Sequence, residues 1–159
     1  MQISLRPAIE TDNDFLYQVF LSTRDQEAGF SHWQTPELEP LMRQQFQLQD
    51  RQYRANYPQG NFDLVLADDN PVGRLYVHRN QTEIRLIDIA LLPEYRQRGI
   101  GRQLLNELVV EADNTTLPLT LHVECNNPVI DFYRRLGFQQ QGETDDLYYF
   151  MRREPEQPC

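Results

Sequence analysis

Residues Leu91–Leu105 have the sequence LLPEYRQRGIGRQLL, which joins the tail of an apolar strand to the start of a helix. Pro93 turns the chain, and two glycines flank Ile100. From there the apolar residues recur at positions 100, 104, 105, 108, 109 and 112, which is the spacing of a helix buried on one face. The sequence therefore predicts that a strand, a turn and a helix meet near Gly99.

The start of this helix has the composition of an anion-binding loop. A first helical turn leaves backbone N–H groups without partners, and the helix dipole adds partial positive charge there. Glycines at 99 and 101 let a phosphate approach the backbone, and Arg96, Arg98 and Arg102 supply further donors. The stretch predicts a pyrophosphate cradle, although it is neither a dinucleotide fingerprint nor a Walker loop. For G-x-G alone, the alternative is a tight turn before a helix.

Two motifs together resemble the GNAT superfamily of N-acetyltransferases. Residues 96–101, RQRGIG, match its Arg/Gln-x-x-Gly-x-Gly/Ala signature, and the preceding IDIALLPEYR is similar to its fourth strand and strand exit. Residues 126–138, NNPVIDFYRRLGF, resemble its N-x-x-A-x-x-F-Y-x-x-x-G-F motif, with Val129 where alanine is usual. The resemblance covers the chain from Ile3 to about Met151.

The resemblance implies acetyl-coenzyme A as the co-substrate, with no metal. In this family the pantetheine arm pairs with the fourth strand, and the loop N–H groups hold the pyrophosphate. Asn126 would hydrogen-bond the pantetheine arm; Asn127 is the adjacent possibility, or else a cap for the next helix. The cofactor-binding residues implied in this way are Ile89, Leu91, Arg96, Gln97, Arg98, Gly99, Ile100, Gly101, Arg102, Asn126 and Tyr133.

The catalytic roles are also implied by the resemblance. Tyr133 becomes the general acid that protonates the departing thiolate, because a phenol and a thiolate have comparable basicity; its alternative is an anchor of the short helix. Some relatives carry a glutamate base on the fourth strand, but Arg85 occupies that position here. The remaining candidates for the base are the carboxylates of Glu83, Asp88 and Glu124, with His122 as a titratable neighbour. Each has a structural alternative, and proton loss through water needs no dedicated residue.

The acceptor side is predicted in residues 24–33, a segment that mixes charges, aromatic residues and glycine and is interpreted as a loop. The family commonly covers its acceptor site with this region, so Glu27, Phe30 and Trp33 are the candidate substrate-binding residues. The alternative is that the two aromatic side chains cap the core while the glutamate is solvated.

Hydrophobic periodicity and turn residues predict the remaining elements. The predicted strands are 3–6, 61–67, 71–78, 83–92, 117–124, 138–141 and 147–153, and the predicted helices are 15–22, 36–53, 100–112 and 128–136. Their order matches the acyl-coenzyme A N-acyltransferase fold, an α/β (α+β) fold whose mixed central sheet of about seven strands is flanked by about four helices. Residues 1–153 are expected to form the one acetyltransferase domain, and 154–159 a tail.

Composition limits the partners. The 159 residues carry a net charge of −9, so the whole surface is not expected to bind nucleic acid or an anionic membrane. No apolar run is long enough to span a membrane, and residues 1–6 lack the layout of a signal peptide, so a cytoplasmic protein is expected. Cys125 and Cys159 have neither a disulfide nor a metal-ligand spacing and are interpreted as free thiols.

The function that these observations predict is an acetyl-coenzyme A-dependent N-acetyltransferase. It would transfer acetyl to an amine of a small molecule or peptide by direct attack in a ternary complex. The alternative is a non-catalytic acyl-coenzyme A-binding sensor or assembly module, and a third interpretation is a nucleotide or phosphate binder of unrelated fold. A homodimer through the final hairpin edge is possible for either of the first two, and the acceptor amine is not determined by the sequence.

Overall fold

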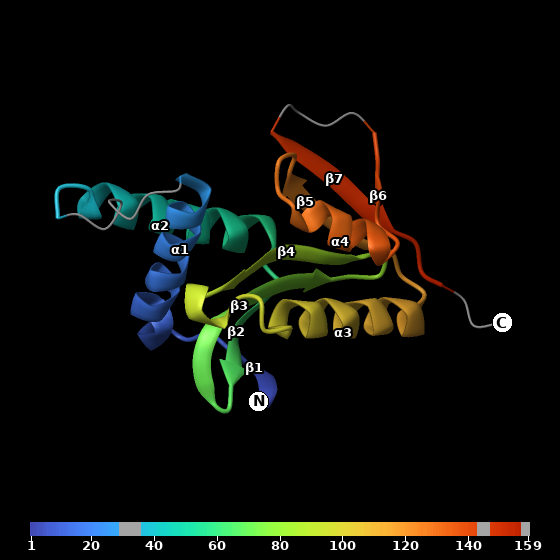
Figure 1. The fold of residues 1–159 in the computed structure, drawn as a ribbon, viewed down its shortest axis with the longest axis horizontal. Helices are drawn as coiled ribbons and strands as arrows, with labels where there is room; N and C mark the ends of the chain where they lie inside the picture. Colours follow the sequence, from blue (N-terminus) through green and yellow to red (C-terminus); the bar gives the residue numbers. More distant parts are fainter. Residues whose placement is uncertain (29–35, 143–146, 157–159) are drawn as a thin grey trace. The chain divides into compact units, whose positions relative to one another are not determined.

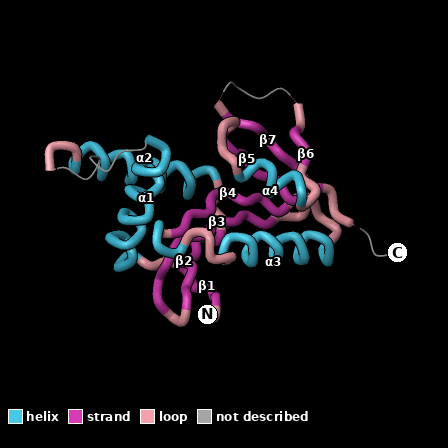
Figure 2. Tube along the Cα trace, in the orientation of Figure 1, coloured by secondary structure: helices cyan, strands magenta, loops and turns pink. Residues whose placement is uncertain are grey.

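The computed structural model describes residues 1–28, 36–142 and 147–156. The helices and strands of these residues are labelled on the ribbon in Figure 1 and coloured by type in Figure 2. The helices are α1 (Asn13–Ala28), α2 (Glu39–Asn56), α3 (Ile100–Thr115) and α4 (Val129–Arg135), with short 3₁₀ helices η1 (Glu10–Asp12) and η3 (Pro93–Tyr95). The strands are β1 (Ile3–Pro7), β2 (Asn61–Ala67), β3 (Asn70–Arg79), β4 (Ile84–Leu91), β5 (Leu119–Glu124), β6 (Gln139–Gln140) and β7 (Tyr148–Arg153).

The strands form one mixed sheet in the order β1-β2-β3-β4-β5-β7-β6. The chain divides into two compact units, the first made of Met1–Tyr76 and Asp88–Gly101, the second of Val77–Ile87 and Arg102–Cys159. Strands β3 and β4 each contribute residues to both units. The sheet with its four helices confirms the fold class expected from the sequence.

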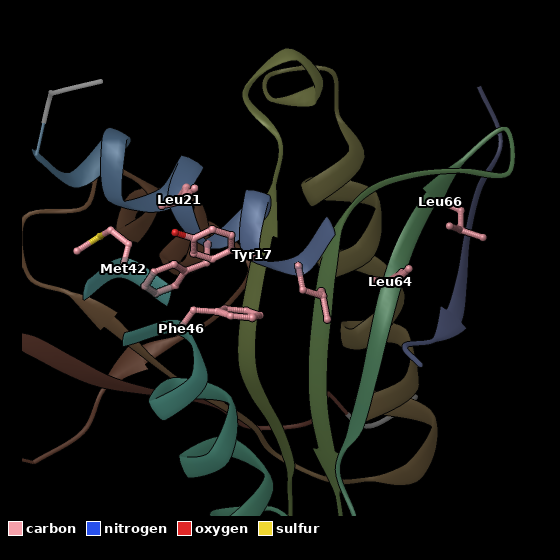
Figure 3. Packing of buried hydrophobic residues seen from close by; sticks show 8 residues of the cluster. Tyr17, Leu21, Met42, Phe46, Leu64 and Leu66 are labelled. Carbon is pink, nitrogen blue, oxygen red and sulfur yellow. The ribbon is translucent and has the colours of Figure 1, made fainter. Parts of the chain in front are cut away.

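The core of the first unit lies where α1 and α2 meet β2 (Figure 3). The ring centroids of Tyr17 and Phe46 are 5.6 Å apart, and those of Phe20 and Phe46 are also 5.6 Å apart, so the two helices meet through tilted aromatic pairs. The helical spacing of the apolar residues places them on one face of each helix. The core side chains are Leu16, Tyr17, Phe20, Leu21, Met42, Phe46, Leu64 and Leu66.

Gly73 on β3 permits a close backbone approach in the first unit. A Cβ atom at this position would lie 2.3 Å from the carbonyl oxygen of Ala90 and 3.0 Å from the Cα of Leu91. Leu92 N–H donates to the carbonyl of Val72 at 2.9 Å, which holds the exit of β4 against β3. The absence of a side chain at Gly73 therefore sets where the end of β4 lies.

In the second unit β5 is flanked by one parallel and one antiparallel neighbour. Ile84 pairs with Leu119 and Arg85 with Thr120 in parallel register, and no later β4 residue described in this unit pairs with β5. Antiparallel pairing of β5 with β7 runs from Leu119↔Arg153 to Glu124↔Tyr148. The strands before and after α3 therefore run parallel, so β4, α3 and β5 form a strand-helix-strand unit.

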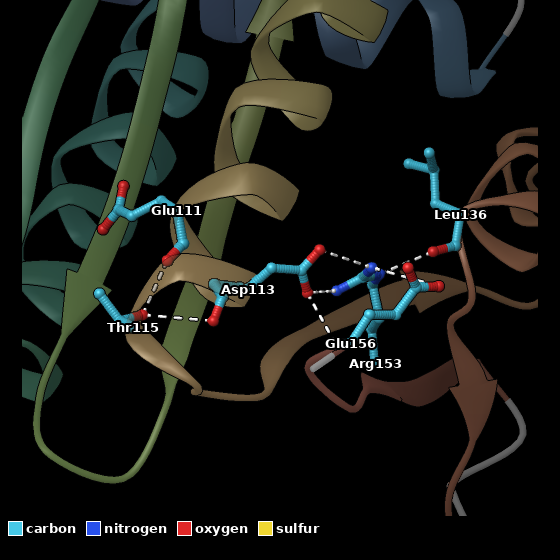
Figure 4. Close-up of polar contacts among 7 residues, drawn as sticks. Glu111, Asp113, Thr115, Leu136, Arg153 and Glu156 are labelled. Carbon is cyan, nitrogen blue, oxygen red and sulfur yellow. Dashed lines mark hydrogen bonds and ion pairs between the residues drawn. The ribbon is translucent and has the colours of Figure 1, made fainter. Parts of the chain in front are cut away.

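Arg153 joins three elements of the second unit (Figure 4). Its side chain is only 4% exposed, and its guanidinium donates to both carboxylate oxygens of Asp113 on α3 at 2.8 and 3.3 Å. It also donates to the carbonyl of Leu136, at the end of α4, at 2.7 Å. Glu156 N–H donates to the same Asp113 carboxylate at 2.8 Å. Because a buried charge must be paired, this clamp makes the docking of α3 and α4 on β7 interdependent.

We expect Asp113→Asn to lower the free energy of unfolding by about 2–3 kcal/mol, because it leaves the Arg153 charge buried without its counter-ion. The Arg153 hydrogen bond lowers the pKa of Asp113 below its usual 3.8. The Asp113–Arg153 pair therefore stabilises the fold fully above about pH 4. This stabilisation is lost as the pH falls through the lower pKa that Asp113 has in the folded state. Urea unfolding at pH 7 and pH 3 checks this, since the gap between wild type and variant should narrow at pH 3. Asp131→Asn, whose 77%-exposed carboxylate lies 3.8 Å from Arg134, is the control and should change stability by less than about 0.5 kcal/mol. A gap of equal size at both pH values would contradict the prediction.

The predicted boundaries agree with most elements, but the end of α1 was predicted wrongly. The helix expected to stop near Ser22 continues to Ala28, so residues 24–28 are helical rather than part of a loop. The hydroxyls of Ser22 and Thr23 donate to the carbonyls of Val19 and Phe20, both at 2.7 Å, and so satisfy themselves inside the helix. The expected second helix also begins later, at Glu39, and ends at Asn56. The two 3₁₀ helices were not predicted.

Candidate active site

The predicted anion-binding loop lies between the end of β4 and the start of α3, in the first unit. Tyr95 N–H donates to Leu92 at 2.9 Å and Arg96 N–H to Pro93 at 3.2 Å, which closes the η3 turn. Beyond it, no hydrogen bond involves the backbone N–H of Gln97, Arg98 or Gly99 within the described part of the chain. All three residues are exposed. The loop therefore offers consecutive backbone donors to a ligand.

The backbone of this loop turns through the left-handed region at two positions. Gln97 has φ of 61° and Gly99 has φ of 87°. A Cβ atom added at Gly99 or Gly101 would meet nothing within 4 Å, so open space lies where side chains would otherwise stand. Ile100, only 2% exposed, anchors the first turn of α3 in the core. A rigid helix start with open space before its N–H groups is suited to a phosphate group.

The guanidinium of Arg96 hydrogen-bonds within the protein, to β4 and α1. Its Nε donates to the carbonyl of Leu91 at 2.9 Å, and its Nη2 donates to the Oγ and carbonyl oxygens of Ser22 at 3.3 and 3.4 Å. Burial is the main cause that lowers the pKa of this guanidinium from its ordinary value. Arg96 therefore ties the end of β4 to α1. Its predicted cofactor contact is untested.

Arg98 and Arg102 are the arginines that the loop presents without a counter-ion. The Arg98 guanidinium lies 5.3 Å from the centroid of the Tyr95 ring, and that of Arg102 lies 5.8 Å from the Phe132 ring. Neither forms a salt bridge with a described residue. Stacking holds a guanidinium in place and leaves its N–H edges available to an anion.

The second motif lies in the second unit, after β5. Asn127 accepts a hydrogen bond from the N–H of Val129 at 3.0 Å through its side-chain oxygen, so it caps the start of α4. Asn126 is exposed, and its side chain forms no hydrogen bond with any residue that the structure describes. Of the two asparagines considered from the sequence, Asn127 thus has the structural role. The side-chain amide of Asn126 has no hydrogen bond to a described residue.

Tyr133 on α4 has a ring fixed by aromatic neighbours. It is 6% exposed, and its ring centroid lies 5.5 Å from that of Phe138 and 6.2 Å from that of Phe132. Its carbonyl accepts hydrogen bonds from the N–H groups of Leu136 and Phe138 at 3.0 and 3.1 Å, at the helix end where Gly137 adopts φ of 103°. The motif therefore places a rigidly held phenol, as a catalytic acid requires.

The candidate bases Asp88 and Glu83 each contact a polar side chain. Asp88 on β4 forms an ion pair with Arg74, whose side chain is 3% exposed and also donates to Gln49 on α2 at 3.1 Å. Glu83 accepts a hydrogen bond from the hydroxyl of Thr120 at 2.9 Å. Glu124 is half-buried at the end of β5. The assignment of a base among these carboxylates stays a prediction.

A further contact, which sequence reasoning did not find, joins Arg85 and His122. The Arg85 guanidinium hydrogen-bonds to Nδ1 of the histidine across β4 and β5. A guanidinium has only donors, so Nδ1 is the acceptor and the ring proton lies on Nε2. The sequence could indicate that the two strands are neighbours. It could not give their register, which decides that Arg85 and His122 meet.

The acceptor-side candidates are only partly described. Glu27 lies in the last turn of α1, at the residue before Ala28. Phe30 and Trp33 lie outside the described residues. The predicted substrate-binding role of all three therefore stays a prediction.

Neither a metal-binding cluster nor a transmembrane helix is found in the described parts of the chain. No three histidine, cysteine, aspartate or glutamate side chains gather closely enough there to hold a metal ion. Among the same residues, no helix is both long and apolar enough to cross a membrane.

A family model described as "Acetyltransferase (GNAT) family" matches residues 25–138, which include both motifs. The chain belongs to the acetyltransferase (GNAT) family. It is also 38% identical over 93 residues to N-alpha-acetyltransferase 50 of Danio rerio, a match that covers 54% of this chain and 55% of that relative. The chain therefore spans about half the length of this curated relative.

Solved GNAT structures share the fold over nearly the whole chain. PaiA N-acetyltransferase from Thermoplasma acidophilum, in complex with coenzyme A, superposes with a TM-score of 0.70 at 22% identity, covering 97% of this chain and 99% of that one. A GNAT family acetyltransferase from Elizabethkingia anophelis with acetyl-coenzyme A bound gives a TM-score of 0.61 at 15% identity, covering 96% and 97%. At these identities the likeness concerns the fold, which agrees with the strand order of the sheet.

Proposed function

We propose that this chain is an acetyl-coenzyme A-dependent N-acetyltransferase that transfers acetyl to an amine of a small molecule or peptide. The observation that carries the proposal is the loop of residues 97–101. Its glycine positions are open, and the N–H groups of residues 97–99 have no partner among the described residues. Family membership gives this loop its ligand, because a GNAT loop with free donors suits the pyrophosphate of coenzyme A. The Thermoplasma and Elizabethkingia proteins bind coenzyme A or acetyl-coenzyme A.

In this proposal the loop N–H groups, Arg98 and Arg102 bind the phosphates, and β4 around Ile89 and Leu91 binds the pantetheine arm. Asn126 would add a hydrogen bond to that arm. The amine attacks the thioester carbonyl directly, the carbon–sulfur bond breaks, and Tyr133 donates its proton to the departing thiolate. The proton that the nitrogen loses leaves through water, from which the phenol is protonated again. Orientation supplies much of the rate enhancement, since effective molarities of well-placed groups reach roughly 10⁵–10⁸ M. Arg96 contributes by holding the end of β4 to α1.

The acceptor, location and assembly are finer parts of the proposal. The curated relative is named as an N-alpha-acetyltransferase, which supports an amino group as acceptor. A cytoplasmic location is proposed because acetyl-coenzyme A is an intracellular co-substrate, and cell fractionation would test it. The arrangement of residues 1–153 as one domain and a homodimer also stay predictions, which limited proteolysis and sedimentation would test.

Thermal unfolding with acetyl-coenzyme A, coenzyme A and ADP tests the cofactor assignment. A ligand at about 100 times its dissociation constant adds roughly 2.7 kcal/mol, which raises Tm by about 5–10 °C for a chain of this size. We expect Tm to rise with both acetyl-coenzyme A and coenzyme A. A second assay should then detect release of the coenzyme A thiol when amines are added with acetyl-coenzyme A. No shift would overturn the proposal. A shift without turnover on any amine would favour the non-catalytic sensor or assembly module.

A further inference from the structure

Arg74 on β3 carries a buried charge in the first unit. Its side chain is only 3% exposed, and its guanidinium forms an ion pair with Asp88 on β4. It also donates to the side-chain oxygen of Gln49 on α2 at 3.1 Å, while its Nε atom has no hydrogen-bond partner among the described residues. Among the same residues, Asp88 is the only carboxylate that pairs with Arg74. Because a buried charge must be compensated, Arg74 fixes the position of the Asp88 carboxylate.

The two oxygens of the Asp88 carboxylate differ in their contacts. Oδ2 is buried and forms the ion pair with Arg74. Oδ1 forms no hydrogen bond with any residue that the structure describes, and the side chain is 20% exposed. An ionised carboxylate oxygen only accepts hydrogen bonds, so Oδ1 suits a ligand that carries N–H or O–H donors.

Asp88 lies on the same part of β4 as the proposed pantetheine contacts. Ile89 is the next residue of the strand and Leu91 is its last, and all three residues belong to the first unit. The acceptor nitrogen has to reach the thioester carbonyl, which the pantetheine arm carries, so the two must be held in register. A donor group that binds at Asp88 is therefore near the reacting carbonyl along the strand.

The ion pair favours binding of a positive group over uptake of a proton. A general base becomes protonated during the reaction, and protonation of Asp88 would leave the Arg74 charge buried without its counter-ion. An ammonium group at Oδ1 leaves the carboxylate ionised and the pair with Arg74 intact. Because Asp88 is largely buried, water screens its charge only partly, which strengthens a charge-assisted hydrogen bond to that ammonium.

We propose that Asp88 binds the ammonium group of the acceptor through Oδ1, and that Arg74 is the positioning residue for this carboxylate. This inference rests on the proposed N-acetyltransferase function. It makes the acceptor an aliphatic amine or a peptide α-amino group, since both have an ordinary pKa of about 7.7 or higher and are largely protonated at neutral pH. The bound ammonium loses one proton to water before its nitrogen attacks, so Asp88 orients the nitrogen without taking its proton.

Acceptor kinetics test the proposal, with the acceptor taken from a thiol-release screen of aliphatic amines and of peptides with free N-termini. Asp88→Asn should raise the acceptor KM at least about tenfold and leave the Kd for coenzyme A within about twofold, and Asp88→Glu should restore part of the loss. Arg74→Gln should raise the acceptor KM about three- to tenfold, because the carboxylate keeps its charge but loses its fixed position. The control Asp12→Asn removes a carboxylate that pairs with Arg6 at 2.8 Å, and it should change KM by less than about twofold.

Two further measurements keep the test independent of turnover and of folding. In wild type and in Asp12→Asn, n-butylammonium chloride should shift the carboxyl carbon resonance of labelled Asp88 saturably, whereas n-butanol should not. The double variant Asp88→Asn with Arg74→Gln removes both charges, so it leaves no buried arginine unpaired and should still have the raised acceptor KM. An unchanged KM in that variant, or equal shifts with the amine and the alcohol, would overturn the subsite while leaving the acetyltransferase function intact. Absence of a thermal shift with acetyl-coenzyme A would instead overturn the proposed function itself.

Discussion

Gly99→Glu is expected to weaken coenzyme A binding on the order of 100-fold. The residue has φ of 87°, a conformation that side chains disfavour by roughly 1–2 kcal/mol. Its Cβ position is open, so the glutamate would fit without a clash and would extend into the space proposed for the pyrophosphate. Two negative groups about 4 Å apart repel each other by several kcal/mol near a protein surface. Isothermal titration with coenzyme A measures the loss.

Gly142→Glu is the matched control for this prediction. Gly142 also has positive φ, at 66°, and a Cβ added there meets nothing within 4 Å. The control therefore imposes a similar backbone strain and the same charge at the end of the chain's last hairpin. It should leave the affinity for coenzyme A within about twofold. Unchanged affinity in Gly99→Glu, or an equal loss in both variants, would contradict the phosphate role of the loop.

The local parts of the fold could be predicted because their causes lie within a few residues. The strand Asn61–Ala67 was predicted at its observed bounds. The pattern of hydrophobic residues indicates the strand, and the turn that follows marks its end. Asp68 and Asp69 adopt φ of 49° and 69°, which their short polar side chains tolerate in a tight turn. The start of α3 at Ile100 follows in the same way from the glycines and the helical spacing.

The side-chain partners could not be predicted, because they lie far apart in the sequence. The sequence offers Arg96 to a phosphate by proximity, but the fold brings it to Ser22, 74 residues earlier. Asp88 has a carboxylate that could act as a base, yet the buried Arg74 on β3 forms an ion pair with it. His122 is separated from Arg85 by 37 residues and meets it only through the register of β4 and β5. A one-residue change in that register would move these side chains to opposite faces.

Sequence motifs and side-chain contacts therefore give different information about this site. The motif locates the loop because backbone N–H groups and glycine conformations depend on local sequence. Within it, the contacts separate Arg96, which holds β4 to α1, from Arg98, which stacks on Tyr95 and forms no salt bridge with a described residue. They separate Asn126 from Asn127 in the same way. A motif match alone does not make these distinctions.

Tyr133→Phe should lower kcat by about 10–100-fold and leave the affinity for acetyl-coenzyme A within about twofold. The substitution removes the hydroxyl but keeps the ring that packs against Phe138 at 5.5 Å, so the position of α4 is preserved. Loss of a general acid costs typically 10²–10⁴-fold, and protonation of the thiolate by water reduces that penalty here. Single-turnover thiol release measures the chemical step, and titration with acetyl-coenzyme A measures binding.

Tyr17→Phe is the control for Tyr133→Phe. It shows how much kcat changes when a buried tyrosine hydroxyl outside the proposed site is lost. Tyr17 is 3% exposed, its hydroxyl donates to the carbonyl of Glu39 at 3.5 Å, and its ring packs in the first unit's core. This control should change kcat by less than about twofold. If Tyr133→Phe kept the wild-type rate, the thiolate would take its proton from water and Tyr133 would serve only to anchor α4. If both binding and kcat fell, the hydroxyl would position the cofactor, because an acid used only after attack leaves ground-state binding unchanged.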